Sequence, residues 1–561
     1  MNQPWLDSYP EGVPAEIDLE EYSSILDIFD QSISRFGKQA AYINFEKELT
    51  YGELDRLTRN FAAWLQSKGL EKGDRIALMM PNILQYPVAL FGAMRAGLVI
   101  VNTNPMYTPR ELKHQLNDSG AKAIVVVENF ANVLQKIGAE TGLEQIITTQ
   151  IGDLLGFPKG FLVNFALKYV KKAVPDYRLP GSTSFSDALK TGAGLSLSPV
   201  NLDLDDLAFL QYTGGTTGVA KGAMLTHRNL VANMQQAKAW MIPAGVGLDT
   251  EIVITALPLY HIFALTSNCL VFMAIGGVNV LITDPRDMQG FVKILSKVPF
   301  TFIPGVNTLF NGLLNTPEFH KLDFSTLKGA LGGGMAVQRA VAKKWRKVTG
   351  TPLVEAYGLT ETSPAACINP INIEKFNGCI GLPISSTDCA IMNDDGDLLP
   401  QGEVGELVIR GPQVMKGYWQ RPEETAKVMT PDGWLRTGDI ALMTEDGYFK
   451  IVDRKKDMIL VSGFNVFPNE IEDVIALHPK VLEVAVVGVP DEKSTEAVKA
   501  FVAKSDPSLT KEELKEYCKE QLTGYKRPRH IEFRDELPKS NVGKILRREL
   551  RDEELKKLKE S

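Results

Sequence analysis

Short apolar runs alternate with segments of helical periodicity over residues 70–340 of the 561-residue chain. Strand-like runs that alternate with helical patterns are typical of α/β layers with largely parallel sheets. The pattern therefore predicts an α/β fold for this part of the chain. The runs lie at 75–80, 99–101, 123–127, 207–210, 252–257, 278–282 and 300–303.

The pattern changes near residue 389, where short strand-like runs are separated by turn signals. Such signals are Asn-Asp-Asp-Gly at 393–396 and Thr-Glu-Asp-Gly at 444–447. This texture predicts a small β-rich subdomain. Five consecutive charged residues follow at 453–457. Such a run is either a solvated loop or a hinge between domains.

A compact α+β unit is predicted after the charged run. The pattern is helical at 468–477 and 510–522 and strand-like at 483–489 and 497–503. The last helix begins with Thr510 followed three positions later by Glu, which is a capping-box pattern. About 100 residues are enough for an independent domain.

Composition and charge narrow the classes of function. Hydrophobic residues make up 44% and charged residues 23% of the chain, as in ordinary globular proteins. The net charge of −7 gives no general attraction to nucleic acid, so a nucleic acid partner is disfavoured. Five scattered cysteines indicate reduced thiols and a cytoplasmic location. We find neither a signal-peptide pattern nor a run of about 18 apolar residues, so we expect no export and no membrane span.

Residues 157–174 form an amphipathic segment. At helical spacing Phe161, Leu162, Phe165 and Tyr169 fall on one side. Either this side packs on the body of the protein with the lysines in water, or the segment is a peripheral helix at the inner face of the cytoplasmic membrane. The sequence leaves both interpretations open. The lysines of the segment are Lys159, Lys168, Lys171 and Lys172.

The candidate chemistry begins with a glycine- and threonine-rich loop at 212–222 (YTGGTTGVAKG). Glycine permits positive φ and close backbone approach, so successive N–H groups can point at one anion. The Walker pattern differs, because there Lys directly follows a glycine and precedes Ser or Thr. The loop is either a nucleotide phosphate cradle or a mobile surface loop. The candidate phosphate-binding residues are Thr213, Gly214, Gly215, Thr216, Thr217, Gly218 and Lys221.

Four further motifs follow this loop in order. They are 257–263 (LPLYHIF), 357–361 (YGLTE), 434–439 (WLRTGD) and 538–544 (PKSNVGK). Together the five motifs resemble those of the adenylate-forming, AMP-binding acyl-CoA synthetase superfamily. The resemblance covers nearly the whole chain and is closest to the bacterial long-chain fatty acid–CoA ligases, whose fatty-acyl signature is similar to residues 432–456. One departure is Arg436, where many relatives carry histidine.

The resemblance implies an N-terminal domain of layered α/β subdomains with a small β-rich subdomain at 1–453, a hinge at 454–456 and a small mobile α+β C-terminal domain at 457–561. It also implies two half reactions. A fatty acid carboxylate attacks the α-phosphate of ATP to give acyl-adenylate and diphosphate, and the thiol of coenzyme A then displaces AMP. ATP and coenzyme A are the expected cosubstrates, Mg²⁺ is the expected cofactor, and a homodimer is the expected assembly. The acyl-CoA would enter β-oxidation or lipid synthesis.

The resemblance also gives roles to residues around the nucleotide. Glu361 is similar to the magnesium ligand of the family, and Thr360 would contact the α-phosphate. A single carboxylate is typical for magnesium, which keeps waters and takes further ligands from phosphate. Tyr357 would stack on adenine, and Gly333 and Gly334 would let the backbone approach the base.

Two further positions complete the implied nucleotide site. Asp439 is similar to the residue that accepts both ribose hydroxyls, and Arg454 would add a cation near ribose and phosphate. Lys544 occupies the position of the adenylation lysine, which bridges the carboxylate and the α-phosphate. His261 would lie near the acyl carboxylate.

A domain rotation is implied between the half reactions, because Lys544 and the pantetheine arm cannot occupy the same face. Lys456 corresponds to the pivot, and Gly463 would face the pantetheine tunnel after rotation. Residues 302–314 either line the acyl pocket or belong to the core.

Other functions on the same fold stay open. A medium-chain or aryl, coumarate-type CoA ligase would share the nucleotide motifs. A non-catalytic acyl-nucleotide sensor would not require Lys544, Glu361 and Asp439 to be intact. An amino acid substrate is disfavoured, because residues 260–265 lack an Asp to bind its ammonium group.

Overall fold

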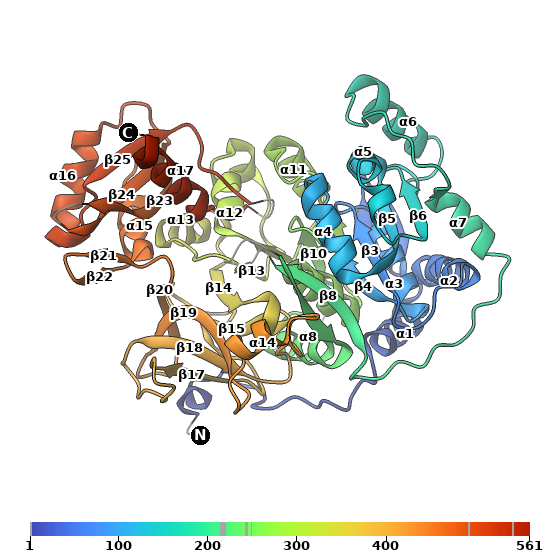
Figure 1. The fold of residues 1–561 in the computed structure, drawn as a ribbon, viewed down its shortest axis with the longest axis horizontal. Helices are drawn as coiled ribbons and strands as arrows, with labels where there is room; N and C mark the ends of the chain where they lie inside the picture. The colour runs from blue at the N-terminus through green and yellow to red at the C-terminus, as the bar shows by residue number, and fades with distance from the viewer. Residues whose placement is uncertain are drawn as a thin grey trace.

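The computed structural model describes residues 3–213, 220–241, 245–247, 250–491, 494–540 and 543–560. Within these residues the chain forms four sheets with helices around them (Figure 1). Three sheets precede the charged run at 453–457 or end in it, and the fourth lies in the C-terminal part, drawn red in Figure 1. The predicted α/β class is confirmed.

The sheet at the right of Figure 1 has the described order β7-β6-β5-β3-β4-β8-β9 and is parallel except for β9, which runs antiparallel to β8. Its central strands are buried on both faces, which explains why they appear in the sequence as continuous apolar runs. Its strands are β3 Arg75–Met79, β4 Val99–Asn102, β5 Ala121–Val127, β6 Gln145–Thr149, β7 Thr183–Ser184, β8 Leu207–Thr213 and β9 Lys221–Thr226.

The second large sheet has the described order β16-β15-β14-β13-β12-β10-β11-β1-β2. It is parallel from β14 to β1 and antiparallel at both ends. Its strands are β1 Ala40–Asn44, β2 Lys47–Thr50, β10 Ile252–Thr255, β11 Val278–Leu281, β12 Phe302–Gly305, β13 Gly329–Gly332, β14 Leu353–Gly358, β15 Ala365–Ile368 and β16 Leu382–Pro383.

Helices cover both large sheets, and two of them, α2 and α4, begin with a complete capping box. The described helices of this part are α1 Ile25–Phe36, α2 Tyr51–Ser67, α3 Gln85–Arg95, α4 Pro109–Ser119, α5 Ala131–Gln135, α6 Lys159–Phe165, α7 Phe185–Gly192, α8 His227–Met241, α9 Ile262–Ala264, α10 Val271–Ala274, α11 Met288–Leu295, α12 Asn307–Leu314, α13 Arg339–Thr349 and α14 Pro422–Val428.

The predicted β-rich subdomain is an antiparallel sheet, and the α+β unit follows it directly. The subdomain has β17 Asp388–Met392, β18 Gly405–Arg410, β19 Leu435–Met443 and β20 Phe449–Arg454. The C-terminal unit has β21 Ile459–Val461, β22 Phe464–Val466, α15 Pro468–Ala476, β23 Val481–Asp491, β24 Thr495–Lys504, α16 Lys511–Gln521, β25 His530–Arg534 and α17 Arg547–Glu560. Thr510 caps α16 as predicted, because its side chain accepts from the Glu513 N–H.

The structure contradicts one of the two interpretations of the amphipathic segment, namely that its apolar side packs on the body of the protein. Residues 159–170 are helical, but Phe161 is 63% and Tyr169 62% exposed, so their side does not pack on the body. The helix is attached through Asn164, which accepts from the Gly152 N–H at 2.7 Å. No described helix is long and apolar enough to cross a membrane.

Candidate active site

Strand β14 carries Tyr357 to Asp439 of strand β19. Tyr357 lies near its end, and its hydroxyl donates to Asp439 Oδ2 of β19 at 2.6 Å. Burial and the nearby Asp439 carboxylate raise the pKa of Tyr357, so the phenol keeps its proton. The 3₁₀ turn η8 (Thr360–Thr362) follows β14 and carries Thr360 and Glu361.

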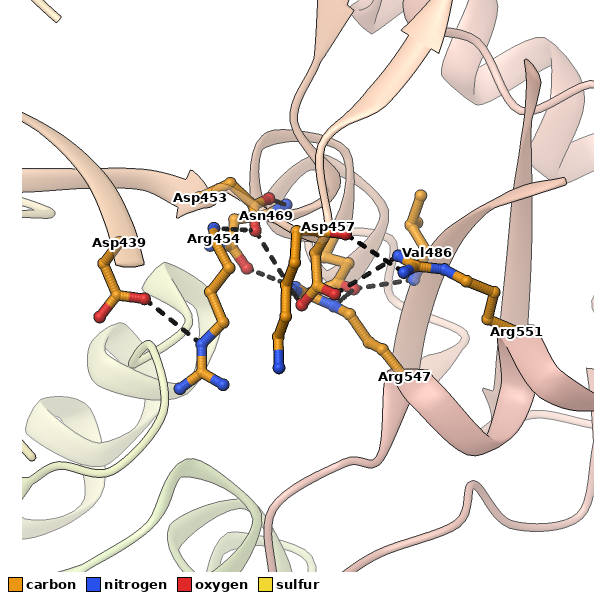
Figure 2. A network of polar contacts seen from close by, with 10 residues as sticks. Asp439, Asp453, Arg454, Asp457, Asn469, Val486, Arg547 and Arg551 are labelled. Carbon is orange, nitrogen blue, oxygen red and sulfur yellow. Dashed lines mark hydrogen bonds and ion pairs between the residues drawn. The ribbon is translucent and has the colours of Figure 1, made fainter. Parts of the chain in front are cut away.

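Asp439 and Arg454 face each other across the antiparallel pair β19–β20. Arg454 Nε lies 3.4 Å from Asp439 Oδ1, and the Asp439 side chain is 7% exposed (Figure 2). The carboxylate therefore has the phenol on one oxygen and a cation beside the other. Arg436 of the same strand instead pairs with Glu406 at 2.7 Å.

Glu361 and Lys221 meet through an aromatic residue that the sequence interpretation did not include. The Tyr418 hydroxyl donates to Glu361 Oε1 at 2.7 Å, and Lys221 Nζ lies 5.1 Å from the centroid of the Tyr418 ring. Lys221 also forms an ion pair with Glu424 of α14. The carboxylate of Glu361 and the cation of Lys221 thus belong to one local arrangement.

The base of the glycine-rich loop lies beside this arrangement. Thr213 ends β8 and Lys221 begins β9, and the two residues are register partners. The other candidate phosphate-binding residues, Gly214, Gly215, Thr216, Thr217 and Gly218, lie outside the described residues. Their predicted role stays a prediction.

Lys544 lies in the same site, although it follows Asp439 by more than a hundred residues. A Cβ on Gly334 would stand 2.9 Å from Lys544 Cε, so glycine leaves the room that the lysine side chain occupies. Burial and nearby Arg454 lower the pKa of Lys544 to about 8, while Asp439 and Glu361 oppose the shift. We call Lys544, Arg454, Asp439 and Glu361 the charged cluster.

The loop that carries Lys544 is fixed to both parts of the chain. The Lys544 N–H donates to Ser540 Oγ at 3.1 Å within the loop. The Thr308 hydroxyl of α12 donates to the Gly543 carbonyl at 2.8 Å, so the loop is also anchored to the N-terminal part. These contacts hold Lys544 against the turn at Gly334.

His261 and Phe263 line the other side of the glycine turn. A Cβ on Gly333 would lie 3.0 Å from the Phe263 ring. Burial and then Lys544 lower the pKa of His261 to about 3, so its imidazole is neutral. Its Nδ1 accepts from the Phe263 N–H at 3.3 Å, which leaves the proton on Nε2.

Two of the predicted residues lie outside the cluster. Gly463 is exposed in the hairpin between β21 and β22, with a φ of +88° and no atom within 4 Å of an added Cβ. Lys456 is exposed in the turn after β20. The apolar segment at 302–314 contributes core side chains, since Phe310 packs edge-on against Trp345 at 4.9 Å.

Tyr418, Glu424 and Arg547 are the residues that the sequence interpretation missed. Arg547 lies three positions after Lys544 and binds carboxylates around the predicted hinge (Figure 2). Tyr418 stands next to Trp419 in the sequence, but nothing in the local sequence indicates that Tyr418 contacts Glu361.

The charged cluster has the chemistry to bind a polyanion. It combines cations with two carboxylates that can hold hydroxyls or a divalent metal. Groups of three or more His, Cys, Asp or Glu that could hold a metal are absent among the described residues. The predicted magnesium ligand Glu361 supplies one carboxylate, and magnesium typically takes its remaining ligands from phosphate and water.

Family models and curated relatives match most of the chain. The family model described as AMP-binding enzyme matches residues 29–419, and that of the AMP-binding enzyme C-terminal domain matches residues 470–544. The chain is 59% identical over 557 residues to a long-chain-fatty-acid–CoA ligase of Yersinia pestis, which covers 99% of both chains. It is 58% identical over 554 residues to one of Escherichia coli O6:H1, which covers 99% of this chain and 98% of that protein.

A solved structure extends the comparison to the fold. ATP-bound MatB from Rhodopseudomonas palustris is similar with a TM-score of 0.80 and 28% identity, over 94% of this chain and 98% of that one. The family model covers more than half of the chain, and the relatives match it almost end to end. The chain therefore belongs to the AMP-binding enzyme family.

Proposed function

We propose that the chain is a long-chain fatty acid–CoA ligase, which converts a fatty acid, ATP and coenzyme A into acyl-CoA, AMP and diphosphate. The observation that carries this proposal is the position of Lys544 in the charged cluster beside Gly334. Bringing a carboxylate to a triphosphate requires cations that are already in place. The two relatives named long-chain-fatty-acid–CoA ligase support the fatty acid as the substrate.

In the first half reaction a carboxylate oxygen bonds to the α-phosphorus of ATP, and the bond from that phosphorus to diphosphate breaks. Negative charge collects on the α-phosphate and the leaving diphosphate. We assign Lys544 to the carboxylate and the α-phosphate, with Thr360 as a further donor. Arg454 adds positive charge near the ribose. Such oriented donors lower a barrier by several kcal/mol because they need no reorganisation.

The nucleoside would lie against β14 and β19. Asp439 already accepts from Tyr357, and its remaining lone pairs are suited to the two ribose hydroxyls. We assign the Tyr357 ring to adenine stacking. We assign the backbone of Gly333 and Gly334 to contact with the base.

Mg²⁺ fits the Glu361 carboxylate. One oxygen of this carboxylate accepts from Tyr418, so the side chain is fixed while its other oxygen stays available as a ligand. When bound, Mg²⁺ would supply positive charge to the phosphates of ATP. Thr213 and Lys221, with the residues between them, are assigned to the same phosphates.

His261 is suited to orienting the fatty acid carboxylate. Its neutral imidazole carries the proton on Nε2, which can donate to a carboxylate without adding charge. A donor without charge would place the carboxylate without neutralising it. We therefore assign His261 to positioning rather than to proton transfer.

In the second half reaction the thiolate sulfur of coenzyme A bonds to the acyl carbon, and the bond from that carbon to the AMP oxygen breaks. The loop of Lys544 occupies the site in the observed arrangement. We propose that the C-terminal domain, residues 457–561, rotates about the hinge at 454–456 with Lys456 as the pivot. Gly463 would then reach the pantetheine path.

A substrate panel tests the proposed acyl preference. The purified protein is given ATP, Mg²⁺ and coenzyme A with acetate, octanoate, palmitate, oleate or coumarate, and AMP and thioester are measured. We expect both products chiefly with palmitate and oleate. A preference for octanoate or coumarate would replace the substrate with a medium-chain or aryl acid. Turnover with none of them would favour the sensor.

We also propose that the segment 157–174 contacts an anionic membrane, where a long-chain fatty acid partitions. Its large apolar side chains are unusually exposed: Phe157 is 91% and Val170 71% exposed. Lysines border this apolar side, and a mixed apolar and basic surface is suited to an interface with anionic lipid. The exposed apolar side chains are Phe157, Phe161, Leu162, Phe165, Tyr169 and Val170.

A homodimer stays a prediction from the family.

Charge reversal tests this membrane surface. Lys168, Lys171 and Lys172 are changed together to Glu, and flotation is measured with vesicles of phosphatidylcholine containing phosphatidylglycerol. Each basic residue near an anionic surface contributes about 1 kcal/mol, so the bound fraction is expected to fall at least about tenfold. The matched control changes the exposed lysines of α16 to Glu, and its flotation should stay at the wild-type level. Equal flotation of both variants would contradict the proposed contact between this segment and an anionic membrane. The control lysines are Lys511, Lys515 and Lys519.

A further inference from the structure

Arg547 is the centre of a buried polar network at the predicted hinge (Figure 2). It is the first residue of α17, and its side chain is 17% exposed. Its Nε donates to Glu472 Oε1 of α15 at 2.8 Å, and Nη1 donates to Asp453 Oδ1 at 3.4 Å. Although burial opposes its charge, Glu472 and Asp453 raise the pKa of Arg547. The arginine therefore stays charged inside the network.

The partners of Arg547 lie on both sides of the pivot. Asp453 precedes it in β20, where it is the register partner of Ile440 in β19. Glu472 and Asp457 follow the pivot, and Asp457 Oδ2 lies 3.8 Å from Arg547 Nη1. Asp453 thus belongs to the N-terminal sheet, while the other two carboxylates belong to the part that would rotate.

Asp453 makes a second contact across the pivot. Its Oδ2 accepts from the Asn469 N–H of α15 at 2.8 Å, and the side chain is fully buried. The carboxylate therefore holds both the first turn of α15 and the first residue of α17. Because Lys544 lies three residues before Arg547, these contacts also fix the loop that places Lys544 in the charged cluster.

We propose that the contact between Arg547 and Asp453 is a latch, and that Arg547 is a positioning residue for the first half reaction. The proposal rests on the proposed function and on rotation at 454–456. Rotation would separate Arg547 from Asp453, whereas Glu472 and Asp457 would move with the arginine. Arg547 would keep carboxylate partners in both arrangements. The Asp453 contact therefore contributes to the equilibrium between the arrangements rather than to folding of the C-terminal part.

The variant Asp453→Asn tests the latch, because Asn keeps the shape and one carbonyl oxygen but loses the charge. Diphosphate release without coenzyme A reports the first half reaction. Thioester formation from supplied acyl-adenylate reports the second. Coupling of this kind typically changes an equilibrium by about 5- to 150-fold, so we expect the first rate to fall about tenfold and the second to stay or rise.

The matched control is Asp457→Asn, which removes a carboxylate from the same arginine on the rotating side of the pivot. Both of its rates should stay within about twofold of wild type. Arg547→Lys is a second test variant, since it keeps the charge but loses the planar fork, and should show the same split as Asp453→Asn. Equal losses in both half reactions in Asp453→Asn, or the same split in Asp457→Asn, would overturn the latch.

Tryptic cleavage at the predicted hinge requires no catalytic turnover, so it tests the latch independently of the proposed function. Arg454, Lys455 and Lys456 are exposed, and initial tryptic cleavage at these residues is followed by mass spectrometry. The latch predicts faster cleavage in Asp453→Asn than in wild type and unchanged cleavage in Asp457→Asn. Unchanged cleavage in Asp453→Asn would overturn it. A wild-type protein that performs neither half reaction would contradict the function, and the cleavage rates would still decide the latch.

Discussion

Replacing Lys544 by alanine is expected to slow acyl-adenylate formation by about 100- to 1,000-fold, the usual cost of losing one preorganised donor at a developing negative charge. With a pKa of about 8 in the free site, Lys544 is mostly cationic at pH 7, and bound phosphates would raise this pKa further. The variant keeps the Gly543 carbonyl that accepts from the Thr308 hydroxyl. The measurement is diphosphate release with ATP, Mg²⁺ and palmitate.

The control for this variant lies in the same loop. Lys539 pairs with Glu483 at 2.8 Å within the C-terminal part, so Lys539→Ala should leave diphosphate release near the wild-type rate. Lys544→Ala should also still convert supplied acyl-adenylate and coenzyme A to thioester. If both half reactions fell equally, Lys544 would not be specific to adenylation.

Replacing Gly463 by leucine is expected to abolish most thioester formation while diphosphate release continues. In the observed arrangement an added Cβ at Gly463 meets no atom within 4 Å, so the side chain does not interfere with adenylation. After rotation the leucine would stand in the pantetheine path. Thioester formation is measured from supplied acyl-adenylate and coenzyme A.

Backbone strain needs its own control here, because leucine at a φ of +88° costs about 1–2 kcal/mol wherever it occurs. Gly396 lies in a turn between β17 and β18 with a φ of +94° and open space around its Cβ. Gly396→Leu carries the same strain away from the site, and both half reactions should persist. Equal loss of thioester formation in the two variants would assign the effect to strain.

The continuous apolar runs of the sequence correctly predicted β3, β4, β5, β8, β10, β11 and β12, because these strands are largely buried. The sequence left a solvated loop or a hinge open at 453–457, but residues 453 and 454 belong to β20 and Asp453 is fully buried, and its partners Asn469 and Arg547 come from later elements. The contact of Tyr418 with Glu361 is equally non-local. Such contacts depend on tertiary packing, which leaves no periodic trace in the sequence.

The amphipathic segment shows what helical periodicity can and cannot predict. Its periodicity correctly predicted a helix, but periodicity does not say what the apolar side contacts. Phe161 and Tyr169 are exposed, because the helix contacts the rest of the protein through Asn164, which lies on a different side of the helix. The candidate site was recognised from motifs, and the structure adds that Lys544 lies against Gly334, where Arg454, Asp439 and Glu361 act on its charge.

Transfer of oxygen from substrate to product tests the central claim most directly. Palmitate labelled with ¹⁸O in its carboxylate is incubated with the protein, ATP, Mg²⁺ and coenzyme A, and the products are analysed by mass spectrometry. Attack of the carboxylate on the α-phosphorus predicts one ¹⁸O atom in AMP, unlabelled diphosphate and palmitoyl-CoA that retains the other. Formation of ADP with labelled phosphate, or of AMP without the label, would contradict an acyl-adenylate pathway.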